Sequence, residues 1–155
     1  MIPEEYVPDL AVRMALYRRL NDAEPGEIEG LAAEMIDRFG PLPAATANLV
    51  KLIEIKHQAI AACIAKIEVG ARGTLVSFHQ DRFPDPAGLI AYVERLQGTA
   101  KLRPDMKLVI NRAWGSPESR LHGLLQLTKG LSGIVRKAEK KKAADTIAAS
   151  SSRFR

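Results

Sequence analysis

The segment from Glu34 to Pro43 constrains the fold of this 155-residue chain more than any other. It reads EMIDRFGPLP, so an amphipathic helix runs into a glycine and a proline that cannot extend it. At 100° per residue from Ile28, an apolar stripe forms on one side, with Ile36 at its margin; it contains Leu31, Ala32, Met35 and Phe39. The segment therefore predicts a helix with one inward face, followed at once by a second helix that starts at Pro43.

The opposite side of the same helix is acidic. Glu34 and Asp37 fall almost opposite the apolar stripe and flank Gly30, which would let a partner come close. Arg38 stands four residues after Glu34, at the spacing of a helical ion pair. A catalytic acid/base pair would need a cleft and a perturbed pKa, and an outward helical face supplies neither. The pattern favours a docking surface over a catalytic site, and a plain solvated face is the alternative.

The rest of the chain predicts further helices and four strands. Hydrophobic spacing changes from a helical period to alternation after Cys63, and returns to a helical period after Asp85 and again after Ser116. The predicted elements are helices over 9–20, 25–39 and 43–63, strands over 65–69 and 74–79, a helix from 85 to 97, strands over 101–103 and 106–110, and a helix from 116. The order αααββαββα predicts an α+β fold with a small, mainly antiparallel sheet.

Each predicted helix carries an apolar face that we expect to point inward. The third helix is apolar on most sides, which is typical of a helix buried between other elements. The faces are Leu10, Met14, Tyr17 and Leu20 on the first helix; Leu49, Leu52, Ile53, Ile60 and Cys63 on the third; Leu89, Ile90, Val93 and Leu96 on the fourth; and Leu121, Leu124, Leu125, Leu131 and Val135 on the last.

The excess positive charge is confined to the C-terminus. Residues 136–155 hold seven of the 23 Lys and Arg residues but two of the 18 Asp and Glu residues, so this segment carries the whole net charge of +5. A neutral body argues against a DNA-binding fold with a basic face. We expect one domain over 1–135 and, over 136–155, a frayed helix end that runs into a flexible basic tail. A weak contact with phosphates or a membrane is the alternative for the tail.

The motifs of common enzymes and metal sites are absent from the sequence. The chain has no phosphate-binding loop, no dinucleotide-binding glycine pattern, no H-E-x-x-H, no G-x-S-x-G and no paired-cysteine zinc pattern. His57, His79 and His122 lie in separate predicted elements, and Cys63 is the one cysteine. We therefore expect no catalytic residues, no metal ligands and a reducing, cytoplasmic compartment. No apolar run approaches the roughly 18–20 residues of a membrane span.

The opening third of the chain resembles a known family. Ile2-Pro3, Tyr6-Val7-Pro8-Asp9, Arg13 and Tyr17-Arg18-Arg19, followed by Glu34-Met35-Ile36-Asp37-Arg38-Phe39-Gly40 and Pro43, are similar to the C-terminal (TRCF) domain of bacterial transcription-repair coupling factors, the Mfd family. Found together at this separation, the two motifs are specific to that family. The expected order of the later elements fits that domain through about residue 135. The last twenty residues match no family pattern.

The resemblance implies that the domain masks a binding surface of its parent protein. In the family, an ATP-driven DNA translocase removes stalled RNA polymerase and recruits the nucleotide excision repair protein UvrA. The motor, polymerase-binding and UvrA-binding modules are absent here, so ATP and magnesium belong to the parent protein and this chain looks like a fragment without a cofactor. The last domain docks on an N-terminal UvrB-like module, competes there with UvrA and so keeps the protein autoinhibited. RNA polymerase and DNA are contacted by other domains.

The resemblance also implies which residues dock. The family's acidic pair falls on Glu34 and Asp37, with Gly30 and Arg38 at the periphery. Arg13, Arg18 and Arg19 match basic positions of the family, but the sequence leaves open whether they are surface, interface or internally paired residues. The alternative function is a nucleic-acid-binding module that acts through the basic tail.

Overall fold

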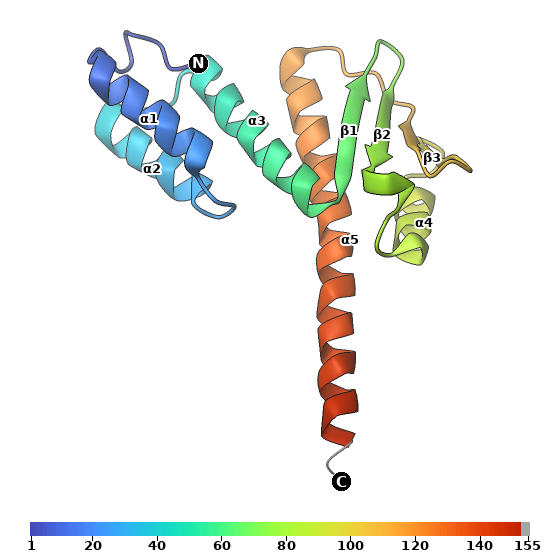
Figure 1. The fold of residues 1–155 in the computed structure, drawn as a ribbon. Coiled ribbons are helices and arrows are strands. Elements are labelled where there is room, and N and C mark those ends of the chain that lie inside the picture. The colour runs from blue at the N-terminus through green and yellow to red at the C-terminus, as the bar shows by residue number, and fades with distance from the viewer. Residues whose placement is uncertain (153–155) are drawn as a thin grey trace. The chain divides into compact units, whose positions relative to one another are not determined.

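The structure is a computed structural model that describes residues 1–152 of the chain, with side chains to residue 150. Its elements follow the predicted order, and the fold is α+β with one four-stranded sheet in the described residues (Figure 1). Contacts within the chain divide it into two compact units. The first comprises residues 1–57 and 116–125, and the second comprises residues 58–115 and 126 onward. The assignment of residues 1–135 to one domain stays a prediction.

The first unit is built around helices α1 (Leu10–Asp22) and α2 (Ile28–Phe39) and the first part of α3 (Ala44–Ala61). The predicted inward face of α2 is confirmed, because Ile28, Leu31 and Met35 are buried while Ile36 is 47% exposed. The core of this unit consists of Ile2, Val7, Leu16, Leu20, Ala23, Ile28, Leu31, Met35 and Val50.

Local hydrogen bonds begin α1 and end α2. The Asp9 carboxylate accepts a hydrogen bond from the Val12 backbone N–H (3.0 Å), which caps the first turn of α1. Gly40 has a φ of +91°, and its N–H donates to the carbonyl of Ile36, so the glycine ends α2 in a backbone conformation that L residues rarely adopt. Pro25 lies in a turn before α2 and not in its first turn as we predicted.

The second unit holds the sheet. Strands β1 (Ile64–Val69) and β2 (Thr74–Phe78) form the predicted hairpin, and β3 (Ala100–Leu102) and β4 (Leu108–Ile110) form the second pair. The strand order is β1-β2-β4-β3, and every neighbouring pair is antiparallel. A short 3-10 helix η1 (His79–Asp81) follows β2 and precedes α4 (Pro86–Arg95).

The core of the second unit lies between the sheet, α4 and the middle of α5 (Pro117–Ser152). Leu89 of α4, Leu108 of β4 and Leu131 of α5 are fully buried. The other buried members are Ala62, Ile64, Val76, Phe78, Phe83, Ala100, Ile110, Leu127, Ile134 and Val135.

Several predicted inward residues face solvent instead. Leu10, Met14, Leu52, Ile60 and Ile90 are between 39% and 65% exposed. In α1 the residues that pack inward are Val12, Leu16, Tyr17 and Leu20, so the prediction is confirmed for Tyr17 and Leu20. Two apolar stripes coexist on such a helix, and spacing alone does not say which one meets the core. The same ambiguity affects α3, whose buried residues are Thr46, Val50 and Ile55.

The basic segment, predicted as a frayed helix end and a flexible tail, continues α5 as a helix up to Ser152. Its side chains from 136 to 150 are exposed apart from the partly buried Ala138, and Figure 1 shows this part of α5 extending past the sheet of its own unit. Alanine and lysine favour helix, which accounts for the regular backbone. Arg153 and Arg155 lie outside the described residues, and the flexibility of the segment stays a prediction. Within residues 1–152, no helix is long and apolar enough to cross a membrane.

Candidate functional site

The sequence motifs at the N-terminus and at the end of α2 meet in the first unit. The Tyr6 hydroxyl lies within hydrogen-bond distance of two carbonyl oxygens, that of Gly40 at 2.7 Å and that of Met35 at 3.1 Å. The Tyr6 ring also packs edge-on against Phe39, with 5.8 Å between the centroids. The Tyr6 hydroxyl therefore lies between a carbonyl in the last turn of α2 and the carbonyl of the glycine that ends the helix. This contact joins the two sequence motifs in the folded chain.

Two more contacts fix the N-terminal segment against α1. The Ile2 N–H donates to the Tyr17 hydroxyl (2.6 Å), and Arg13 Nη1 donates to the carbonyl of Val7 (2.8 Å). Arg13, which sequence reasoning could not assign, therefore has an internal structural role. The N-terminal segment, α1 and α2 form one connected support for the outer face of α2, defined here by Gly30, Glu34 and Asp37.

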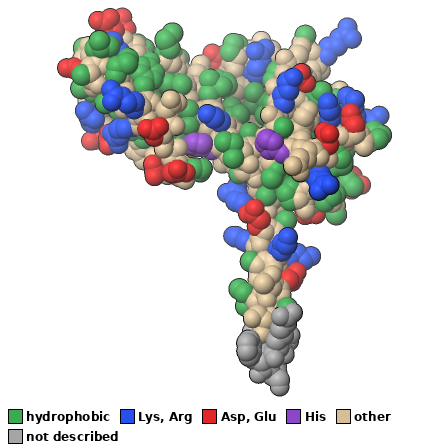
Figure 2. Space-filling view, in the orientation of Figure 1, with side chains coloured by type: hydrophobic (Ala, Val, Ile, Leu, Met, Phe, Trp, Pro, Cys, Tyr) green, Lys and Arg blue, Asp and Glu red, His purple; other side chains and the backbone are tan. Residues whose placement is uncertain are grey.

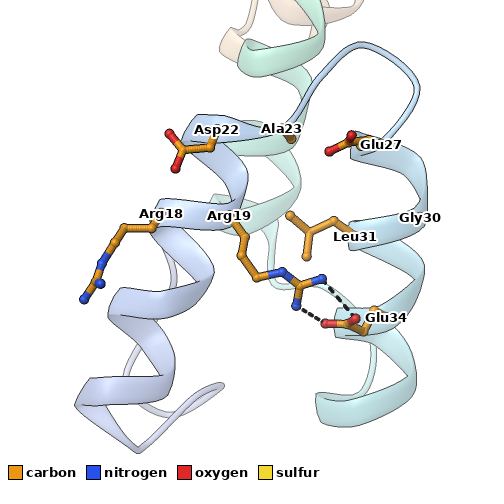
Figure 3. Close-up of a pocket in the computed structure, with 8 residues that line it drawn as sticks. All are labelled: Arg18, Arg19, Asp22, Ala23, Glu27, Gly30, Leu31 and Glu34. Atoms are coloured by element: carbon orange, nitrogen blue, oxygen red, sulfur yellow. Dashed lines mark hydrogen bonds and ion pairs between the residues drawn. The ribbon is translucent and has the colours of Figure 1, made fainter.

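Glu34, which the helical pattern placed on an outward face, is paired with two arginines. The guanidinium of Arg19, on α1, donates two hydrogen bonds to it, Nη2 to Oε1 at 3.1 Å and Nη1 to Oε2 (Figure 3). Arg38 Nη1 lies 3.5 Å from the same Oε2, which confirms the i,i+4 ion pair expected from the sequence. The Glu34 side chain is 38% exposed, and those of Arg19 and Arg38 are 49% and 46% exposed.

These contacts stabilise the charged form of Glu34. The hydrogen bonds from Arg19 are the main cause that lowers the pKa of the Glu34 carboxyl below its usual value, and the charges of Arg19 and Arg38 lower it further. The same pair raises the pKa of Arg19. Glu34 is therefore ionised at neutral pH, but two cations already neutralise its field.

An open depression of about 530 Å³ lies between α1 and α2 around this ion pair. Figure 3 shows the Arg19 side chain crossing it from α1 to Glu34, with Leu31 between the two helices. Arg18 and Asp22 point away from α2 in the same view. The lining residues are Arg18, Arg19, Asp22, Ala23, Glu27, Gly30, Leu31 and Glu34. The depression is open and is lined by both charged and apolar residues, and it fits a side chain of a partner better than a buried small molecule.

Asp37 and Gly30 are the open positions of the outer face. Asp37 is exposed, and residues 1–150 offer it neither a hydrogen bond nor an ion pair. A side-chain carbon added at Gly30 would have nothing within 4 Å. Arg38 stacks on Phe39, with its Cζ 4.8 Å from the ring centroid. Of the predicted carboxylate pair, Glu34 is therefore neutralised by arginines, whereas Asp37 has no ion-pair partner in residues 1–150.

The other candidate residues of the sequence do not gather into a site. His57 lies in α3, His79 begins η1 and His122 lies in α5. Cys63 is partly buried in the turn between α3 and β1. In the part of the chain that the structure describes, no group of three or more His, Cys, Asp and Glu residues could hold a metal ion. The chemistry available at the outer face of α2 is charge pairing and hydrogen bonding.

Comparison with known proteins places the chain in a family. A model described as the TRCF domain matches residues 1–89, which is more than half of the chain. The chain belongs to the TRCF domain family. The transcription-repair-coupling factor of Myxococcus xanthus is 32% identical over 117 residues, which cover 75% of this chain and 10% of that protein. The corresponding protein of Rickettsia conorii is 35% identical over 109 residues, covering 70% of this chain and 10% of that protein.

A solved structure supports the fold of this TRCF domain. It is described as the C-terminal domain of transcription-repair coupling factor, and it superimposes with a TM-score of 0.69 over 88% of both chains at 20% sequence identity. The chain spans about a tenth of the length of the curated relatives it matches. The family name connects the domain to DNA repair.

Sequence reasoning missed Arg19 as the partner of Glu34 in this TRCF domain. The pair joins residues 15 positions apart on two helices, so no helical periodicity reports it. The only signal was the basic pair Arg18-Arg19, in which one residue faces α2 and the other faces away. To choose between them, one must know which face of α1 points toward α2. The sequence pattern placed Leu10 and Met14 on the inward face and so gave the wrong orientation of the helix about its axis.

Proposed function

We propose that this TRCF domain is a non-catalytic regulatory domain that docks on the N-terminal UvrB-like module of its parent protein. Docking covers the surface that UvrA uses, so the domain holds the repair function of a DNA translocase in check. The observation that carries the proposal is the exposed Asp37, without a partner in residues 1–150, on the outer face of α2 beside the open Gly30. The sequence resemblance implies the partner, and the match of the TRCF domain model to residues 1–89 supports that resemblance.

The physical character of this surface suits a contact that must open. Charge pairs across an interface fix register and discriminate between partners. Interfaces between domains that move relative to one another are modest in area and more polar than permanent ones. The outer face of α2 offers charge and little apolar area, since the apolar residues Leu31 and Met35 are buried in the unit below it.

Charge reversal at Asp37 tests the proposal directly. We expect Asp37→Arg to abolish binding of the domain to the isolated UvrB-like module, and Glu34→Arg with Asp37→Arg to do the same. Glu29→Arg is the matched control, because Glu29 is equally exposed on the same helix but lies outside the outer face. Loss of binding in all of these variants, or in none, would refute docking through this face.

A second candidate function is a contact with nucleic acid through the C-terminal part of α5. The observation in its favour is that residues 136–150 form an exposed helix with five Lys and Arg residues and two acidic residues, both kinds being visible in Figure 2. Such binding would weaken steeply with salt and disappear on deletion of 136–155. The charge reversal at Glu34 and Asp37 would leave it intact or strengthen it. That opposite response separates the two functions.

A further inference from the structure

Arg19 neutralises one of the two carboxylates through which the proposed docking would act. Its guanidinium covers both oxygens of Glu34, and Arg38 approaches Oε2 as well. Glu34 with these two cations carries a local charge of +1. An incoming cation would therefore meet repulsion at Glu34 and attraction only at Asp37.

The position of Arg19 is also open enough to be vacated. Its side chain is 49% exposed and lies across a depression of about 530 Å³ that opens to solvent. Exposed ion pairs are weak and exchange readily with water. The largely buried Ala23 and Leu31 line the same depression.

We infer that Arg19 occupies, in the undocked domain, the place that a cationic side chain of the partner takes on docking. This inference rests on the proposed function and specifies the chemical group of the partner that contacts Glu34. The incoming group is best matched by a guanidinium, because its planar fork satisfies both oxygens of a carboxylate, as Arg19 does here. Its hydrocarbon stem would lie along the apolar lining of Ala23 and Leu31.

Arg19 then acts as an internal competitor that sets how firmly the domain is held. The apparent affinity of the partner for the domain is the intrinsic affinity multiplied by the fraction of domains in which Arg19 does not occupy Glu34. Such a competitor keeps the contact specific, since Glu34 and Asp37 still select a cationic partner, but makes it easier to open. Arg38 does not leave in this scheme, because its guanidinium also stacks on Phe39.

Substitution of Arg19 tests the inference. Arg19→Met removes the charge and keeps an unbranched stem, and we expect it to tighten binding to the UvrB-like module on the order of three- to tenfold. Arg18→Met is the matched control: it changes the net charge equally, but Arg18 points away from α2 and has no ion pair in residues 1–150. We expect little change in the control, and unchanged circular dichroism in both variants.

A double-mutant cycle shows whether Arg19 acts through Glu34. In a Glu34→Gln background, Arg19→Met should no longer tighten binding, because the carboxylate that Arg19 occupies is gone. Equal tightening by Arg18→Met and Arg19→Met would reduce the effect to net charge and overturn the inference. Unchanged or weaker binding of Arg19→Met would also overturn it, while the proposed function would stand if Asp37→Arg still abolished binding. Absence of any binding by the unaltered domain would overturn both.

Discussion

Tyr6 and Glu34 each take part in a polar contact between α2 and the segments before it. Tyr6 reaches the end of α2 from the N-terminal segment, and Glu34 receives Arg19 from α1. The first contact is uncharged and partly buried, and the second is ionic and largely open to water. We therefore expect Tyr6 to matter for stability and Glu34 to matter more for recognition.

Removal of the Tyr6 hydroxyl should destabilise the domain. In Tyr6→Phe the carbonyls of Met35 and Gly40 lose their donor, and we expect the free energy of unfolding to fall by about 1–2 kcal/mol. Tyr92→Phe is the control, since the described residues give the Tyr92 hydroxyl no hydrogen bond. Urea unfolding of both variants measures the difference. Equal losses would show that the hydroxyl contact at the end of α2 is not responsible.

The ion pair at Glu34 predicts a pH dependence of stability. Because the folded pKa of this carboxyl lies below its ordinary value of 4.5, its contribution is present above that value and is lost as the pH falls through the lowered pKa. Glu34→Gln should therefore differ from the unaltered domain by a constant amount between about pH 7 and pH 5, and the difference should shrink only at lower pH. A difference that stays constant under acid conditions would contradict an ionic origin.

At the scale of elements, α2 has one face that the fold needs and one that it leaves open. Leu31 is 6% exposed in the core of the first unit, whereas Ala33, two residues later, is exposed. Leu31→Asp places a charge in the core and should lower the free energy of unfolding by more than about 3 kcal/mol. Ala33→Asp should change it by about 0.5 kcal/mol or less. Thermal melts of both variants check the assignment of the faces, and similar melting temperatures would refute it.

Two glycines should respond to alanine in opposite directions. Gly30 lies in α2 with open space where a side chain would be, so Gly30→Ala should stabilise the domain by roughly 0.5–1 kcal/mol. At Gly73, in the hairpin, the added carbon would lie 2.4 Å from the carbonyl oxygen of Ile110, so Gly73→Ala should destabilise it. Chemical denaturation of the two variants measures the sign of each change in the free energy of unfolding. A destabilised Gly30→Ala would mean that this part of α2 is packed and not open.

Short sequence signals predicted where helices and strands lie. They did not predict contacts between residues that are far apart in the sequence. Asp9, Gly40 and Asp85 act on backbone groups within a few residues, so their caps can be inferred from the sequence alone. Which apolar stripe of a helix meets the core depends on neighbours far along the chain, and Leu52 and Ile60 were misplaced for that reason. The same limit applies to the candidate site, where Asp37 was placed correctly on the exposed face and the partner of Glu34 was not foreseen.

At the scale of the whole molecule, charge divides the chain into a neutral part and a basic C-terminal part. Residues 1–135 carry equal numbers of acidic and basic residues, and the excess of positive charge begins at Arg136 on the exposed part of α5. The outer face of α2 and the basic part of α5 belong to different compact units. Each can therefore be altered without touching the other, and variants can assign binding to one of them.

The most direct test of the account is titration of this domain into the isolated UvrB-like module of its parent protein, followed by addition of UvrA. The account predicts saturable binding that UvrA displaces and that Asp37→Arg removes, whereas deletion of residues 136–155 leaves it unchanged. Simultaneous binding of UvrA and the domain to the module would contradict masking, even if the domain itself bound tightly.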